Sequence, residues 1–159
     1  MLNLIYALKF VHMLAAGAMF GAWLAIAVFM VLGHCAQNPS VVAVVSRFVV
    51  RVELFITAAA IVLQPITGIL LASAIGLSPS DQFWIMLSLA IFAVVVLCWL
   101  AALIIEIRVR NLTREATLGG QPLPPAYGKL FRLWSALALP ILAGMVALFA
   151  VMIWQPRLD

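Results

Sequence analysis

The chain has 159 residues, of which 67% are hydrophobic and 9% are charged, with a formal net charge of +4. Soluble domains are about half apolar and about a quarter charged, so this composition excludes an ordinary water-soluble protein. The basic excess does not indicate a nucleic-acid-binding protein, because the sequence has no basic stripe interleaved with aromatic residues. Membrane lipid is the one partner that the composition requires.

Four apolar stretches are long enough to cross a bilayer, whose hydrocarbon core of about 30 Å needs about 20 residues per helix. The expected spans are residues 2–32, 52–74, 83–105 and 130–154. We therefore predict an all-α fold, a transmembrane four-helix up-and-down bundle that forms a single membrane domain over residues 1–159. We interpret the first span as a retained anchor, because it stays apolar far beyond a typical signal-peptide core.

Residue types that favour helix starts and helix ends occur at the boundaries of these spans. Asn38 and Ser78 each precede a proline suited to the first helical position, and Asp81 would complete a capping box with Ser78. The third helix is thus expected to begin near residue 79. It should continue a turn or two past the membrane and break at Gly119 and Gly120.

Basic residues are concentrated on one side of the predicted bundle. The opposite side has only Lys9 and Arg157, whereas seven fall in or beside the segments after spans one and three: Arg47, Arg51, Arg108, Arg110, Arg114, Lys129 and Arg132. Short loops rich in Lys and Arg stay in the cytoplasm. We therefore predict a protein of the bacterial inner (cytoplasmic) membrane with both termini periplasmic and cytoplasmic loops around residues 34–50 and 108–128.

The first candidate functional residue is His12, because ionisable residues inside spans are costly and commonly functional. At about 1.5 Å per residue, four side chains fall at similar depths in the periplasmic half: His12, Gln64, Ser88 and Met145. Bundles build cofactor sites from such facing side chains. We predict that His12 ligates the iron of a b-type haem that Gln64 also contacts, with Met145 as sixth ligand and Lys9 neutralising a propionate. Met19 or a partner subunit could supply the sixth ligand instead. The alternative is a structural histidine bonded to a backbone carbonyl or to Gln64.

Other chemically capable residues have simpler interpretations. His34 lies about 33 Å further along the same helix and is expected to be a polar helix end. Glu53 and Glu106 lie among arginines near the cytoplasmic span ends, where we expect pairing with arginine and headgroups, a proton path being the alternative. Cys35 and Cys98 are not placed for a disulfide in an oxidising compartment.

Small residues recur every four positions in the first span, at Gly17, Gly21 and Ala25. This spacing lets helix backbones approach closely, so we expect an intramolecular packing seam along this face. Three methionines of the same span suit Cu(I) as well as an apolar core: Met13, Met19 and Met30.

Short motifs occur in a characteristic order along nearly the whole chain: Lys9-Phe-Val-His12 followed by Met-Leu-Ala-Ala-Gly-Ala, Pro65-x-x-Gly68, Tyr127-Gly-Lys-Leu130-Phe-Arg132-Leu-Trp134, and Trp154-Gln-Pro156. With these motifs the chain resembles a family of short bacterial four-span proteins, known as predicted integral membrane proteins of unknown function. More distantly, the Lys-x-x-His opening is similar to copper resistance protein D and to the HemJ-type protoporphyrinogen oxidase, which associate a first-helix histidine with haem. That resemblance implies a haem role for His12. The later-span lysine of HemJ-type enzymes has no counterpart in span three.

These observations favour an integral membrane b-type haem protein that takes part in electron transfer or redox chemistry, between quinone and a periplasmic redox protein. A second hypothesis is a non-enzymatic membrane subunit or scaffold, as a homo-oligomer or in a larger complex, without a cofactor. A third is a copper or small-solute permease. No complete catalytic constellation assigns an enzyme activity.

Overall fold

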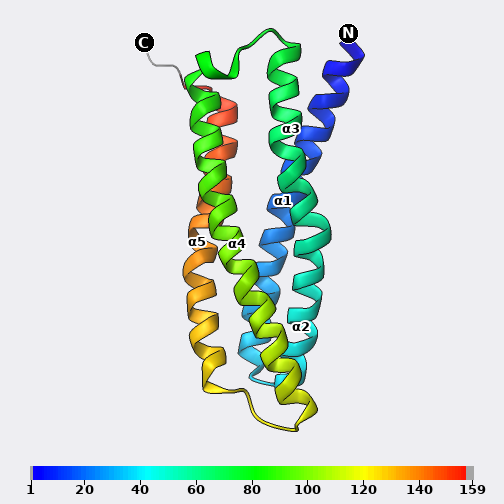
Figure 1. Cartoon of the computed structure of the whole chain (residues 1–159), viewed down its shortest axis with the longest axis vertical. Helices are drawn as coiled ribbons and strands as arrows, with labels where there is room; N and C mark the ends of the chain where they lie inside the picture. Colours follow the sequence, from blue (N-terminus) through cyan, green and yellow to red (C-terminus); the bar gives the residue numbers. More distant parts are fainter. Residues whose placement is uncertain (1, 157–159) are drawn as a thin grey trace.

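The computed structural model describes residues 2–156, which fold into four long antiparallel helical rods (Figure 1). The elements in chain order are α1 (Leu2–Ala36), α2 (Pro39–Val52), the π-helical turn η1 (Glu53–Thr57), α3 (Ala58–Ala74), the 3₁₀ turn η2 (Pro79–Asp81), α4 (Phe83–Leu118) and α5 (Pro125–Trp154). Residues 2–156 contain no strand. The predicted all-α bundle is confirmed.

The turn between the first two rods is much shorter than expected. The Asn38 side chain accepts hydrogen bonds from the backbone N–H groups of Ser40 and Val41, at 2.9 and 3.5 Å, and α2 begins at the predicted proline. The loop expected around residues 34–50 is therefore wrong in extent. Hydropathy alone misses α2 because it is amphipathic, with a buried face that includes Val49 and an exposed face that carries arginine.

The entry into α4 also differs from the expectation. Residues 79–81 form a single 3₁₀ turn and α4 begins at Phe83. The Ser78 hydroxyl contacts the Ser80 hydroxyl at 2.9 Å, and Ser80 donates to the Asp81 carboxylate at 3.0 Å, so the predicted capping box is wrong.

The other end of α4 follows the prediction. The helix ends at Leu118, Gly119 caps it, and Gly120 adopts a left-handed φ of 62°. Because the helix runs this far, the connection to α5 spans only residues 119–124, less than the predicted loop 108–128.

The rods are longer than a bilayer is thick. Helix α1 has 35 residues and α4 has 36, which correspond to about 50 Å at 1.5 Å per residue, against about 30 Å of hydrocarbon. The basic residues cluster toward the end of the bundle that carries the short turns. We infer that this end extends beyond the hydrocarbon layer.

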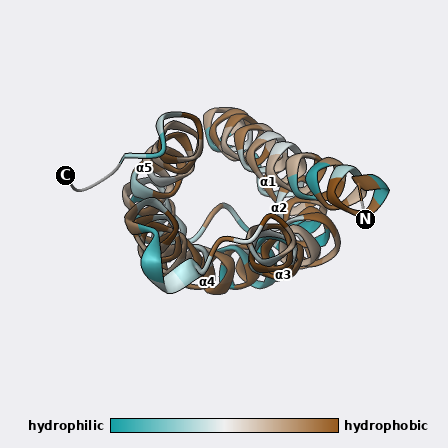
Figure 2. Cartoon of the chain, turned by 90° about the horizontal axis from the view of Figure 1, so that it is seen from above, coloured by the Kyte–Doolittle hydropathy of each residue, from teal (hydrophilic) through white to brown (hydrophobic). Residues whose placement is uncertain are grey.

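The outside of the bundle is apolar. All four rods are long and apolar enough to cross a membrane, and hydrophobic residues cover their outer as well as their inner sides (Figure 2). Large exposed side chains such as Phe55, Leu97 and Leu139 would be costly in water. In a bilayer they face lipid, which makes four-span membrane insertion the natural state of this fold.

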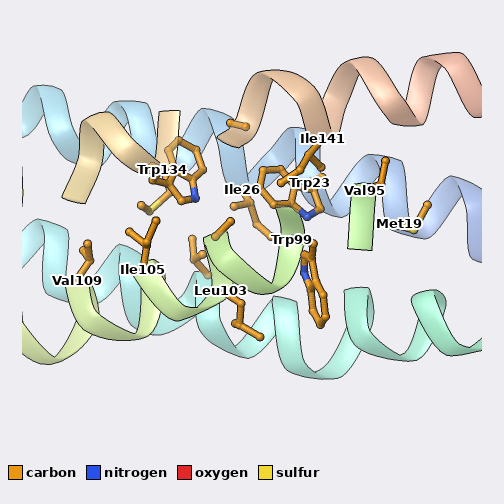
Figure 3. Packing of buried hydrophobic residues seen from close by; sticks show 14 of the residues in the cluster. Met19, Trp23, Ile26, Val95, Trp99, Leu103, Ile105, Val109, Trp134 and Ile141 are labelled. Carbon is orange, nitrogen blue, oxygen red and sulfur yellow. The ribbon is translucent and has the colours of Figure 1, made fainter. Parts of the chain in front are cut away.

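The interior is a continuous apolar cluster in which tryptophans from three helices point between the rods (Figure 3): Trp23 from α1, Trp99 from α4 and Trp134 from α5. The rings of Trp23 and Trp134 are stacked, with centroids 6.2 Å apart and planes within 7°. The tightest glycine contact joins α5 to α4, because a methyl group at Gly144 would overlap Val95 Cγ2.

The expected packing seam on α1 is wrong. Gly17 and Gly21 are exposed, and a methyl group at either position would meet nothing within 4 Å in this chain. The buried face of α1 is instead the one that carries Met19, Trp23 and Ile26. The four-residue spacing identified a helix face but not which neighbour, if any, that face contacts.

Candidate functional site

Two separate polar sites lie inside the bundle, and the first is built around His12. The His12 ring on α1 meets α3, where its Nδ1 lies 2.9 Å from the Thr67 hydroxyl. The Gln64 amide donates to the backbone carbonyl of His12 at 3.1 Å. A methyl group at Gly68 would come within 3.2 Å of His12 Cε1, so the glycine makes room for the imidazole.

The hydrogen bonds of Thr67 fix the tautomer of His12. The Thr67 hydroxyl lies 2.6 Å from the Leu63 carbonyl, an acceptor that can only receive its proton. Thr67 Oγ1 must then accept at its other contact, so His12 Nδ1 is the donor there. In the neutral ring the lone pair consequently resides on Nε2. A histidine oriented in this way by a second residue is the usual arrangement of a metal-ligating histidine.

Ser88, Met145 and Lys9 are not among the hydrogen-bond partners of His12. Met145 is 1% exposed inside the hydrophobic cluster on α5, whereas the polar contacts of His12 come from α3. Ser88 is back-bonded to the Trp84 carbonyl at 2.7 Å. Lys9 is exposed, one turn before His12 on α1. The structure therefore brings His12 together with Gln64, as in the structural alternative, and adds Thr67.

The second site holds two glutamates that are completely buried. Glu53 and Glu106 are both 0% exposed. They come from η1 and α4 and lie close enough for their charges to repel each other. Our expectation that they pair with arginine and headgroups at the membrane surface is wrong. Their hydrogen-bond donors are indoles: Trp99 Nε1 donates to Glu53 at 2.6 Å, and Trp134 Nε1 donates to Glu106 at 2.7 Å.

Half of the carboxyl oxygens at this site have no hydrogen-bond partner. Within residues 2–156, one oxygen of each carboxyl group, Glu53 Oε1 and Glu106 Oε2, is buried without a hydrogen-bond partner. The Thr57 hydroxyl lies beside the Glu53 carboxyl without a hydrogen bond of normal geometry, and Trp23 Nε1 is likewise unpaired. Buried polar atoms are rarely left unpaired, so this cluster requires an explanation.

The glutamate site coincides with the one irregular turn in the second rod. The Ala58 N–H bonds to the Glu53 carbonyl five residues earlier, in place of the usual four. Such π-turns are rare and occur frequently at functional sites. Here the turn contains both Glu53 and Thr57.

The sequence contains a signal for this site that our interpretation overlooked. Glu53 is two residues from Arg51, and Glu106 is two residues from Arg108. Positions two apart lie on nearly opposite sides of a helix. Because both arginines are exposed, each glutamate must point away from its neighbouring arginine, into the bundle.

A second pair of buried polar side chains lies between the glutamates and the basic end. Ser46 and Thr113 are both 0% exposed and their hydroxyls lie 3.5 Å apart between α2 and α4. Each is seven residues, two helical turns, from the glutamate on its own rod. Beyond them is an open pocket of about 480 Å³ with this lining: Ala43, Arg47, Arg51, Arg110 and Arg114.

His34 is part of an aromatic cluster at the basic end. Its ring stacks on Phe131 with centroids 3.8 Å apart, and its Nδ1 lies 3.2 Å from the Tyr127 hydroxyl. This arrangement ties the end of α1 to the start of α5.

The described residues contain no group of three or more His, Cys, Asp or Glu side chains that could hold a metal ion.

The methionines of the copper hypothesis are dispersed. Met13 is 72% exposed on the outside of α1, whereas Met19 is buried in the core. Cys35 is exposed and Cys98 is partly buried, and both are free thiols.

Taken together, the fold defines a four-span α-helical integral membrane protein with one half-buried polar site at His12 and one fully buried polar site at the two glutamates. A model of the family described as "Predicted integral membrane protein (DUF2269)" matches residues 6–156, and the chain belongs to this family. Searches of curated proteins and of solved structures found no match. The comparisons do not show the distant similarity to copper resistance protein D or to HemJ-type proteins that the opening motif suggested.

Proposed function

We propose that this protein is a membrane redox protein that binds a b-type haem through His12 Nε2. The observation that carries the proposal is the Thr67 contact, which makes His12 Nδ1 a donor and leaves the Nε2 lone pair for a ligand. The residues fit this role in type, because a neutral, oriented imidazole is a standard haem ligand.

The neighbours of His12 have distinct roles in this proposal. Thr67 fixes the ring orientation, Gln64 holds the α1 backbone at His12, and Gly68 provides space for the imidazole. Lys9, exposed one turn away, would neutralise a haem propionate. Met145 stays a prediction as sixth ligand, because α5 would have to present it to the same site.

Haem would supply one-electron redox chemistry, and quinone and a periplasmic redox protein are the proposed electron donor and acceptor. The proposed location is the bacterial inner membrane with both termini periplasmic. Its support is the clustering of seven basic residues toward the end of the bundle that carries the two short turns. A periplasm-active phosphatase fused to the C-terminus should be active, whereas activity only in fusions to the turn at residues 119–124 would refute this orientation.

The test of the haem proposal is an absorption spectrum of the protein purified from haem-replete cells, with pyridine haemochrome analysis. We expect a Soret band that His12→Ala abolishes or shifts to a weakly bound form. The matched control is His34→Ala, which removes the other histidine of α1 and should leave the spectrum unchanged. A colourless wild-type protein that takes up no added haem would refute the proposal and favour the non-enzymatic subunit or scaffold.

A further inference from the structure

We propose that Glu53 and Glu106 form a proton-binding site inside the membrane, at which the two carboxyl groups take up and release protons from the cytoplasmic side. The proposal is independent of the haem proposal. It rests on the burial of both side chains, their indole donors, the unpaired carboxyl oxygens and the π-turn that places Glu53 at the site.

In the part of the chain that the structure describes, no cation is paired with either glutamate. Between residues 13 and 33 α1 has no titratable residue, and α3 has none. On the remaining rods Cys98 is partly buried, and the other charged or titratable groups lie toward the basic end: Arg47, Arg51, Arg108, Arg110, Arg114, Glu115, Tyr127, Lys129 and Arg132. The donors that reach the carboxyl groups are neutral indoles.

Two negative charges without a cation would be energetically costly at this buried site. A buried carboxylate without a cation is strongly disfavoured in a medium of low dielectric constant, and two neighbouring ones repel each other as well. Carboxyl groups in such a position take up a proton or bind a cation. One indole N–H per carboxyl is consistent with a pair that carries less than its full negative charge.

The oxygens at this site suit a proton better than a metal cation. Calcium takes six to eight oxygen ligands, and magnesium requires an octahedron. Among the side chains of the described site, three oxygens are without a hydrogen-bond partner, namely one from each glutamate and the Thr57 hydroxyl. Both glutamates and Thr57 are 0% exposed, which leaves no open side from which water could complete a metal shell. A proton needs one carboxyl oxygen to bind and another oxygen to accept its hydrogen bond.

The route from the glutamates to water runs toward the basic end of the bundle. The Ser46 and Thr113 hydroxyls lie two turns from the glutamates, and the arginine-lined pocket follows at the basic end, which is the cytoplasmic end in the proposed orientation. Val49 and Val109, both 0% exposed, occupy the intervening turn. The proton balance is simple, because a proton from water forms an O–H bond on one carboxylate and leaves by the reverse step. Passage requires local opening at the valine layer, so we expect slow exchange.

The experiment is infrared spectroscopy of the full chain in lipid nanodiscs during a pH titration, following the C=O stretching band of protonated carboxylic acids. We expect the wild type to show this band at neutral pH, to lose it as pH rises, and to exchange slowly into D₂O. Glu53→Gln and Glu106→Gln should each remove or strongly reduce the band. Glu115→Gln, an exposed glutamate on the same helix as Glu106, is the matched control and should retain it.

A further variant keeps the proposal testable if the glutamine variants fail to fold. Trp134→Phe keeps both carboxyl groups but removes the donor to Glu106, so the band should persist at a shifted frequency. The absence of a protonated carboxyl band in the wild type at every pH would overturn the proposal, as would a band unaffected by both glutamine variants. Disappearance of the band on addition of NaCl or CaCl₂ at constant pH would also overturn it, because the ligand would then be a metal cation.

Discussion

Gly144 on α5 is the position where a single added methyl group should harm this bundle most directly. A Cβ atom there would overlap Val95 Cγ2, whereas carbon atoms in ordinary contact are about 3.5–4.0 Å apart. Val95 is 2% exposed and β-branched, so its side chain cannot easily rotate away. Overpacking of this kind costs about 1–3 kcal/mol in soluble cores.

The Gly144→Ala substitution also changes helix propensity, which favours alanine by about 1 kcal/mol in water-soluble hosts. Gly21→Ala is the matched control, because its new methyl group meets nothing within 4 Å of the chain. The free energy of unfolding of Gly144→Ala should therefore fall below that of Gly21→Ala by about 1–3 kcal/mol. The assay is reversible unfolding in mixed micelles of increasing SDS fraction, followed by the fluorescence of the buried tryptophans.

A second substitution tests whether Val95 causes the effect. Val95→Ala removes the methyl group that Gly144→Ala would strike, so the double variant should recover part of the lost stability. The double-mutant cycle should give a favourable coupling of about 1 kcal/mol or more, within the range found for contacting residues. Equal stabilities of Gly144→Ala and Gly21→Ala, or additivity in the double variant, would refute this account of the α4–α5 contact.

Three other predictions follow from individual contacts. Trp134→Phe leaves a buried carboxyl without its donor and should lower the free energy of unfolding by about 1–3 kcal/mol; the exposed Trp154→Phe should not, and equal effects would exclude the hydrogen bond as the cause. Thr67→Val removes the hydrogen-bond acceptor of the His12 ring. If His12 holds haem, this variant should weaken haem binding about 10- to 100-fold in a titration followed by the Soret band. Unchanged binding would show that the Thr67 hydroxyl does not orient a ligand. His34→Ala removes an aromatic stack and should cost about 0.5–1.5 kcal/mol in the SDS assay; an unchanged midpoint would mean that the stack contributes nothing to stability.

Hydropathy predicted the four rods because a bilayer requires long apolar helices, and such helices are evident from composition. Hydropathy could not predict where the rods end on the basic side of the bundle. Residues 39–52 and 106–118 alternate buried and exposed sides, and such amphipathic helix resembles a polar loop in a hydropathy average. The lengths of the connecting loops were therefore overestimated on the basic side, where residues 37–38 and 119–124 suffice.

The sites were harder to predict because they depend on the rotation of each helix about its own axis. Depth placed His12 and Gln64 at one level, and these two do meet, through the His12 backbone carbonyl. The same depth argument could not show which way Met145 faces. For the glutamates the π-turn adds a further unknown, since one extra residue rotates the following helix by about 100° relative to the preceding one.

The two polar sites can be separated experimentally because they lie at different heights on one face of α1. His12 and Trp23 are eleven residues apart, about three turns and about 16 Å, and Ala15 and Met19 form the apolar layer between them. Substitutions more than about 10 Å apart without shared partners act additively. A variant at Glu53 or Glu106 should therefore leave the surroundings of His12 unchanged, and a variant at His12 should leave the carboxyl band unchanged. Failure of one proposal would not by itself remove the support for the other.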